Sequence, residues 1–377
     1  MNGFSFGRFV AILVKEFVQM RRDRLTFAMI IGIPILQLIL FGFAINSDPK
    51  NLPAVVRSAD NSAFARSFVV ALKNSGYFAI LGEAATEAEA QRLIETGQVQ
   101  FVINIPADFA RELMQGRRPQ ILIEADATDP AATSNAIAAL TNAARTAFDR
   151  ELMGTLARLK PGADPVELVI HRRYNPEGIT QYNVVPGLMG VVLTMTMVVM
   201  TAMAMTRERE RGTMETLLAT PARPAEVMLG KIVPYIFVGY IQVVLILLAA
   251  WLLFAVPIVG SLWLLLAALV VFIAANLCIG FTISTVAQSQ LQAMQMSFFF
   301  FLPSLLLSGF MFPFRGMPAW AQTIGEIFPL THFLRIVRGI LLKGNEFPAI
   351  SAELLALCAI LTVASFVALR RYRQTLD

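Results

Sequence analysis

Apolar residues gather into six runs along the chain, each close to the length of a membrane-crossing helix. A helix needs about 20 consecutive apolar residues to cross the hydrocarbon core of a bilayer. The six runs cover residues 25–45, 184–205, 233–256, 261–285, 292–312 and 351–369. Pro257 and Gly260 divide the third run from the fourth, and Arg370 ends the sixth. The pattern predicts an α-helical membrane bundle of six transmembrane helices (TM1 to TM6), with TM2–TM6 inside residues 184–377.

Residues 46–183, between the first two runs, have a different character. Short β-rich stretches alternate there with helix signals, which predicts a layered α/β domain. Strands are expected at 52–56, 77–81, 99–105 and 121–124, and helices at about 60–76, 86–97, 106–116 and 129–160. Thr86 and Glu89 match a helix capping box, and Gly97 a helix end.

The first 24 residues predict a helix lying on the cytoplasmic surface of the membrane. Large apolar residues recur there at helical spacing, between basic residues. These apolar residues are Phe6, Phe9, Val10, Leu13, Phe17 and Met20. A short apolar core with a small-residue cleavage site is missing, so we expect no cleavable signal.

Basic residues predict the orientation of the bundle. Five Lys or Arg lie in residues 1–24, five in the loop 206–231 and three in the C-terminal tail. With six crossings all thirteen fall on one side, and cytoplasmic segments collect such residues. Both termini are therefore expected in the cytoplasm, and the α/β domain outside, in an inner (cell) membrane.

Composition agrees with a membrane protein. Hydrophobic residues make up 56% and charged residues 15% of the 377 residues, and mean hydropathy is +0.63. Soluble proteins carry about 25% charged residues. The net charge of +5 has no aromatic-interleaved basic stripe or nucleic-acid motif beside it, so we expect no nucleic-acid partner. Two cysteines and two histidines, far apart, predict no metal site.

The predicted spans lack the ionisable residues with which ion-coupled transporters bind their coupling ion. Ranges 25–45, 184–205, 233–256, 261–285, 292–312 and 354–369 contain no Asp, Glu, Lys or Arg. Ion-coupled transporters keep such groups at membrane depth. The nearest approach to a phosphate-binding loop, Gly230-Lys231, has Ala225 and Ile232 at positions that require Gly and Ser or Thr. We therefore expect no catalytic residues and no cofactor here, and an energy source on another subunit.

The loop 206–231 is long enough for such a subunit to dock. Met214, Leu217 and Leu218 give a short helix an apolar face, and Pro221 ends that helix. A second short helix is expected at 224–229. On these residues alone, an amphipathic connector and a solvated charged loop both remain open.

A resemblance gives the loop a role. The stretch RERERGTMETLLATPARPAEVMLGKIVPY resembles the cytoplasmic loop of type-2 ABC transporter permeases. Similar segments are KEFVQMRRDR, RYNPEGITQYNVVPG and LPSLLLSGFMFPFRGMPAWAQ, so the likeness covers nearly the whole chain. The large external domain resembles that of the drug-exporting branch of this family.

The resemblance implies an exporter driven by a partner. Two permease subunits would pair and bind ABC ATPase subunits through a coupling helix, with membrane lipid and a periplasmic adaptor as further partners. The implied docking residues are Glu208, Glu210, Arg211, Gly212, Thr213, Glu215, Leu217, Leu218 and Pro221. An amphiphilic drug or lipid-like cargo suits the Phe-rich spans.

The outer segment 302–345 is interrupted by prolines, including Pro303 and Pro313. Irregular backbone near membrane depth survives inside protein or beside water, so we expect a re-entrant pair of short helices at the exit; a plain external loop is the alternative. A further helix lying on the outer membrane interface is suggested by four apolar residues at helical spacing. They are Phe333, Ile336, Val337 and Ile340.

Two other classes of protein remain open. One is a membrane receptor or assembly factor whose outer domain binds a ligand without transport. The other is a membrane enzyme using outer carboxylates such as Asp126 and Asp129, although a helix-capping role suits Asp129 better.

Overall fold

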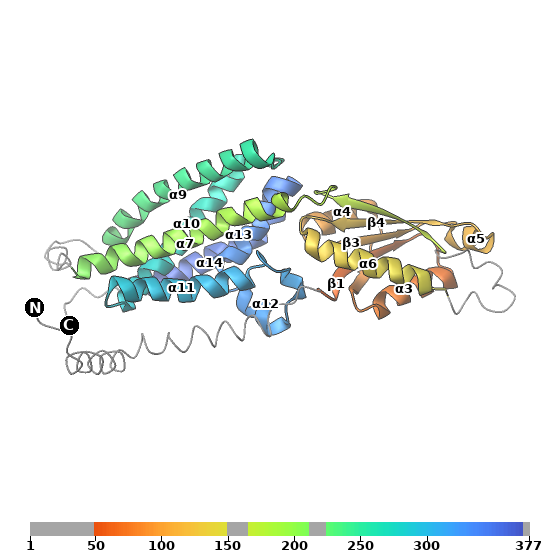
Figure 1. Cartoon of the computed structure of the whole chain (residues 1–377), viewed down its shortest axis with the longest axis horizontal. Coiled ribbons are helices and arrows are strands. Elements are labelled where there is room, and N and C mark those ends of the chain that lie inside the picture. Colours follow the sequence, from red (N-terminus) through yellow and green to blue (C-terminus); the bar gives the residue numbers. More distant parts are fainter. Residues whose placement is uncertain (1–48, 149–164, 211–223, 372–377) are drawn as a thin grey trace, which may run out of the picture.

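The computed structural model describes residues 49–148, 165–210 and 224–371. An α/β domain and a bundle of long helices lie end to end along the longest axis of the molecule (Figure 1). The predicted interfacial helix 1–24 and the first predicted span 25–45 lie outside the described residues. Six spans, and the placing of the α/β domain between the first two, therefore stay predictions.

The α/β domain is built on one five-stranded sheet with the strand order β2-β1-β3-β4-β5. Neighbouring strands are parallel except for the antiparallel pair β3 and β4. The strands are β1 Leu52–Ser58, β2 Phe78–Glu83, β3 Phe101–Ile105, β4 Gln120–Asp126 and β5 Glu167–Arg173.

Helices cover both faces of this sheet because successive strand residues point to opposite sides. On β1, Ala54 and Val56 join a core with Phe68 of α3, whereas Val55 packs with Ile94 of α4 on the other face. The four helices are α3 Ala63–Asn74, α4 Glu87–Glu95, α5 Phe109–Met114 and α6 Pro130–Thr146.

The four predicted strands and the helices after them are present, with four differences in detail. The helix expected at 129–160 ends at Thr146, and residues 149–160 lie outside the described residues. Helix α3 begins later than expected and is capped by Ser62, whose Oγ accepts from the Ala65 amide. The capping box holds at Thr86, but the Glu89 carboxylate accepts from the Ala85 amide. Strand β5 was not predicted.

The bundle contains five helices, within the described residues, that are long and apolar enough to cross a membrane. They are α7 Thr180–Glu210, α9 Pro224–Phe254, α10 Leu262–Val286, α11 Gln290–Leu307 and α14 Phe347–Arg371. The separate short helix expected at 224–229 is wrong, because α9 runs through it without a break.

Helix α10 lies at the centre of the bundle, between α7 and α14. Its Phe272, Ile273 and Phe281 are fully buried, and Gly280 lets α7 approach closely. A Cβ at Gly280 would lie 2.6 Å from the Val198 carbonyl oxygen of α7. The outer helix α9 exposes large apolar side chains, as a lipid-facing helix should.

Between α11 and α14 the chain forms two short helices, α12 Ala319–Gly325 and α13 Pro329–Arg338, with the helical turns η3 Phe314–Gly316 and η4 Gly339–Lys343 beside them. The prediction that Phe333, Ile336 and Val337 lie on the outer interface is wrong, since each is 0% exposed. Helix α13 packs on α7, α10 and α14, and the rings of Phe333 and Phe272 stack with centroids 4.1 Å apart. The apolar stripe therefore faces protein.

Candidate functional site

Seven of the nine predicted docking residues, from Arg211 to Pro221, lie outside the described residues. The other two, Glu208 and Glu210, occupy the last turn of α7, at the end of the bundle remote from the α/β domain (Figure 1). Their role in docking an ATPase stays a prediction.

Glu210 ties the end of α7 to the start of α11. Its carboxylate accepts from the Gln290 backbone amide at 2.8 Å and from Nε2 of the same residue at 2.5 Å. These hydrogen bonds lower the pKa of Glu210 below its usual value. Arg207 also donates to Gln290, at 3.5 Å. A displacement of the loop after Glu210 would therefore act on α11 as well as on α7.

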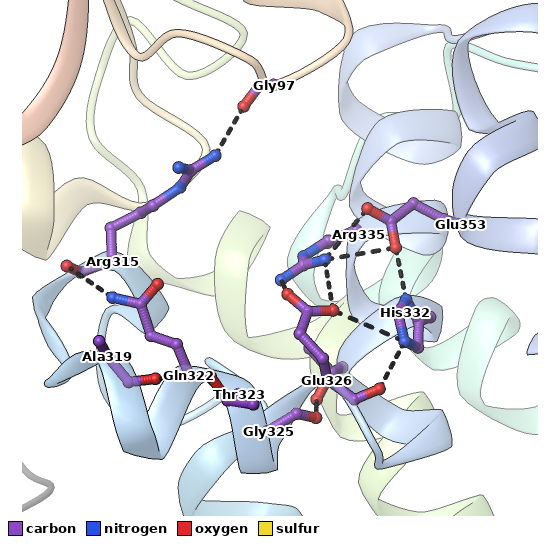
Figure 2. A network of polar contacts seen from close by, with 11 residues as sticks. Gly97, Arg315, Ala319, Gln322, Thr323, Gly325, Glu326, His332, Arg335 and Glu353 are labelled. Carbon is purple, nitrogen blue, oxygen red and sulfur yellow. Dashed lines mark hydrogen bonds and ion pairs between the residues drawn. The ribbon is translucent and has the colours of Figure 1, made fainter. Parts of the chain in front are cut away.

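The opposite end of the bundle holds an ionic cluster that comes from three elements (Figure 2). Arg335 of α13 donates to Glu326 at 2.5 Å and to Glu353 of α14 at 3.1 Å. The ring of His332 lies between the same partners, with Nδ1 2.6 Å from the Glu353 carboxylate and Nε2 2.9 Å from the Glu326 carbonyl oxygen. Two carboxylates thus face two basic groups.

The geometry favours a charged His332. Both ring nitrogens face oxygen acceptors, and only the imidazolium can donate from both. Burial alone would lower the pKa of His332, but the hydrogen bond to Glu353 and the contacts with Glu326 outweigh it and raise the pKa above its usual value. The cluster is then balanced, with two negative and two positive charges.

This cluster was missed in the sequence, although part of its signal was present. His332 and Arg335 are one helical turn apart, and Glu353 falls inside the predicted run 351–369, just before its charge-free part. The end of the bundle beside the α/β domain is therefore more ionic than the charge-free ranges of the sequence suggested.

The α/β domain is fastened to this end of the bundle by polar contacts. Lys343 Nζ lies 2.5 Å from the carboxylate of Asp126 and donates to the Ile94 carbonyl oxygen at 3.2 Å. Asn345 donates to the Glu95 carbonyl oxygen at 3.0 Å. We call these contacts, together with the Arg315 bond to the Gly97 carbonyl oxygen at 3.2 Å (Figure 2), the interdomain clasp.

The two carboxylates considered for an enzyme have structural partners. Asp126 is bound by Lys343 and by the amide and hydroxyl of Thr128. Asp129 accepts from the Ala132 amide at 3.5 Å, at the start of α6, which fits the capping role. The two carboxylates thus have structural roles, Asp126 in holding Lys343 and Asp129 at the start of α6.

Two hollows of the described structure could hold a ligand. One cleft of about 590 Å³ lies between the α/β domain and the bundle, beside the clasp and the ionic cluster. A larger and more open hollow of about 1120 Å³ lies at the carboxyl ends of β1 and β3. Its Arg57 and Glu87 are exposed and paired with each other, so the cleft between the domains is the better candidate site.

Long apolar helices with ionic groups gathered at their ends, beside a separate α/β domain, define a polytopic membrane protein. Comparison of the sequence with known families then identifies it: the chain belongs to the ABC-2 family of transporter proteins, whose pattern matches residues 24–370.

Several curated relatives are named permeases. YbhS of Escherichia coli K12, named a probable multidrug ABC transporter permease, is 30% identical over 350 residues and 90% of each chain. YbhR of the same strain, also named a probable multidrug permease, is 27% identical over 98% of this chain and 99% of its own. YhhJ, an inner membrane transport permease of that strain, is 30% identical over 91% of this chain and 93% of its own. The resemblance noted in the sequence is confirmed.

Proposed function

We propose that this chain is the membrane-spanning subunit of an ATP-binding-cassette exporter, which moves an amphiphilic cargo outward with ATP hydrolysed on a separate subunit. One observation carries the proposal: charged residues stand at the two ends of the bundle, and the ranges 184–205, 233–256, 261–285, 292–312 and 354–369 contain none. Such a bundle lacks groups to bind a coupling ion at membrane depth. Its driving force must enter at one end.

The distribution of charge supports an orientation. Helix α7 starts at Thr180, shortly after β5, and carries Arg207 at its far end. Helix α14 ends with Arg370 and Arg371, also away from the α/β domain (Figure 1). Basic residues favour the cytoplasm. The α/β domain would then stand outside, and ATP would act at the opposite end of the bundle.

In this proposal the loop after Glu210 receives the ATPase. Movement there would reach α11 through the bonds between Glu210 and Gln290, and reach α9 directly along the chain. Two copies of the permease, each with the predicted span 25–45, would rock between inward- and outward-open states. The family relationship supports a permease pair and an ATPase partner, and an adaptor outside the membrane remains an expectation.

The docking role can be tested by charge reversal. Glu208→Arg and Glu215→Arg should reduce co-purification of the ATPase and abolish ATP-dependent efflux of cargo from whole cells, with normal insertion in the membrane. The matched control is Glu83→Arg, an exposed position on β2 of the α/β domain. Unchanged ATPase binding and efflux in both loop variants would rule out docking at this loop.

The open hollow on the α/β domain favours one second candidate, a receptor or assembly factor that binds a ligand without transport. The two functions differ in their need for ATP. If the phenotype of a deletion strain is restored by the chain together with an ATPase that cannot hydrolyse ATP, the receptor function is correct and the exporter function is wrong.

A further inference from the structure

Arg338, in the last turn of α13, has a guanidinium that is incompletely satisfied. Its Nη1 donates to the Gly309 carbonyl oxygen at 3.2 Å. Its Nε and Nη2 are cut off from solvent and have no hydrogen-bond acceptor among the described residues. A buried donor without a partner is costly, and a buried charge more so. An arginine stays protonated in proteins, so losing the proton does not relieve the cost.

The carboxylates near Arg338 are occupied by other groups. Asp126 is bound by Lys343, and Glu326 and Glu353 are bound by Arg335. Burial lowers the pKa of Arg338, and the charges of Asp129 and Asp126 oppose this shift in part. Two donors of Arg338 are therefore without an acceptor among the described residues, although carboxylates lie near.

The free donors have the arrangement that recognises an oxyanion. Nε and Nη2 form one edge of the planar guanidinium, and two parallel N–H groups on such an edge match two oxygens of a carboxylate or phosphate. An alcohol or amide offers one acceptor oxygen and leaves the second donor unpaired. A cation is repelled. The chemistry of the edge therefore selects a singly or doubly charged oxyanion.

Arg338 lines the cleft of about 590 Å³ between the α/β domain and the bundle. That volume lies within the range of small-molecule sites, about 300–1,000 Å³. Arg315 lines the same cleft and has no carboxylate within ion-pair distance among the described residues. Leu334 and Ile350 add apolar surface from α13 and α14. Charged and apolar walls together suit an amphiphile rather than a free ion.

We propose that this cleft binds the carboxylate or phosphate group of an amphiphilic cargo, with Nε and Nη2 of Arg338 as the principal donors and Arg315 as a second cation at the rim. The donor edge is covered in this arrangement, so binding accompanies a small parting of the α/β domain from the bundle at the clasp. The inference rests on the proposed export function for its choice of an amphiphile, and not for the oxyanion site itself.

The test is equilibrium binding of radiolabelled dodecyl phosphate to the purified full chain in dodecyl maltoside. Dodecyltrimethylammonium and inorganic phosphate serve as competitors. The variants are Arg338→Gln, Arg338→Lys and Arg315→Gln. The matched control, Arg117→Gln, removes one positive charge from an exposed position of the α/β domain outside the cleft. Gel filtration of each variant reports whether it is folded.

Arg338→Gln should weaken binding of dodecyl phosphate about tenfold or more, the scale expected for losing a charge-assisted hydrogen bond. Arg338→Lys should restore part of it, because the charge returns without the paired donors. Arg117→Gln should bind as the wild type does. If Arg338→Gln does not fold, a severalfold loss in Arg315→Gln carries the same conclusion.

The proposal is wrong if wild type, Arg338→Gln and Arg315→Gln bind dodecyl phosphate equally. It is also wrong if dodecyltrimethylammonium displaces the ligand as efficiently as unlabelled dodecyl phosphate does. If inorganic phosphate displaces the ligand at the same concentrations as dodecyl phosphate, the cleft binds an oxyanion but does not select an amphiphile, and that part of the proposal is wrong. The assay contains no ATPase, so it measures the site apart from transport. Retained binding by a chain that moves no amphiphile even together with its ATPase and ATP would refute the proposed function and leave this site standing.

Discussion

The interdomain clasp gives a prediction whose size follows from burial. Lys343 and Asp126 have side chains that are 8% and 7% exposed, and their charged atoms lie 2.5 Å apart. Lys343 also lies over the Tyr174 ring, 5.2 Å from its centroid. Lys343→Met keeps most of the apolar stem and removes the charge. It leaves the Asp126 carboxylate buried, with Thr128 as its remaining hydrogen-bond donor among the described residues.

Breaking a buried pair by removing one partner costs about 3–5 kcal/mol, because an uncompensated charge is left behind. The matched control is Arg57→Met. Arg57 pairs with Glu87 at 3.3 Å, but the side chains are 37% and 75% exposed. An exposed pair contributes about 0–1 kcal/mol. The two variants should therefore differ by at least about 2 kcal/mol.

The assay is thermal unfolding of the purified chain in detergent, combined with hydrogen exchange of the segment 94–97. The carbonyl oxygens of that segment accept the clasp hydrogen bonds, so loss of the clasp exposes the segment to water. The exchange of its backbone amides should therefore rise, even if the α/β domain separates from the bundle while remaining folded. The double variant Lys343→Met with Asp126→Asn should be more stable than Lys343→Met alone, because the buried charge is gone. If Lys343→Met costs no more than Arg57→Met, with unchanged exchange at 94–97, the clasp is not a stabilising contact.

Two further predictions concern the bundle. Because the pKa of His332 is raised by folding, its stabilising effect should be complete below its ordinary value of 6.5 and be lost as the pH rises through the folded-state pKa. The stability difference between wild type and His332→Gln should therefore shrink from pH 6.5 upward, and a difference that grows with pH contradicts the assignment. Gly280→Leu should wedge α7 from α10 and destabilise the chain by about 1–3 kcal/mol or more. Gly82→Leu, where a Cβ would meet nothing within 4 Å, is its control, and equal melting temperatures of the two variants would contradict the close approach.

Much of the fold follows from local pattern. Helix α10 is apolar on all sides and ends near breakers, so its run was predicted within one residue at each end, at 261–285 against Leu262–Val286. The strands β1 and β3 are buried on both faces and stand out as continuous apolar runs. Strand β5 was not predicted because it is an edge strand with a weak apolar pattern. Glu167 and His171 are exposed, and Leu168 and Ile170 contact the core.

The misplaced helix α13 shows where pattern stops being sufficient. An apolar stripe bearing Phe333 and Val337 at helical spacing fits a lipid interface and a protein core equally well. What decides between them is α14, which returns along α13 and brings Glu353 against His332 and Arg335. Contacts between residues about twenty positions apart depend on that return. The sequence shows His332 and Arg335 one helical turn apart, but it does not show that Glu353 reaches them.

The free edge of Arg338 was invisible for a similar reason. In the sequence, Arg338 is one of four basic residues in the segment 313–350 and has no motif around it. Its distinction is that its neighbours' carboxylates are already paired, which depends on the docking of the α/β domain. The docking loop is the reverse case. Its residues carried the family resemblance in the sequence, but most of them lie outside the described structure.

The central claim is that this bundle has no energy source of its own and takes its driving force from an ATPase bound at its basic end. The most direct measurement is reconstitution of the purified chain into liposomes, with and without the ATPase that co-purifies with it. Uphill movement of an amphiphilic dye is then followed after addition of ATP. We predict accumulation that requires both subunits and ATP hydrolysis. Uphill movement, or ATP cleavage, by the chain alone would contradict the claim.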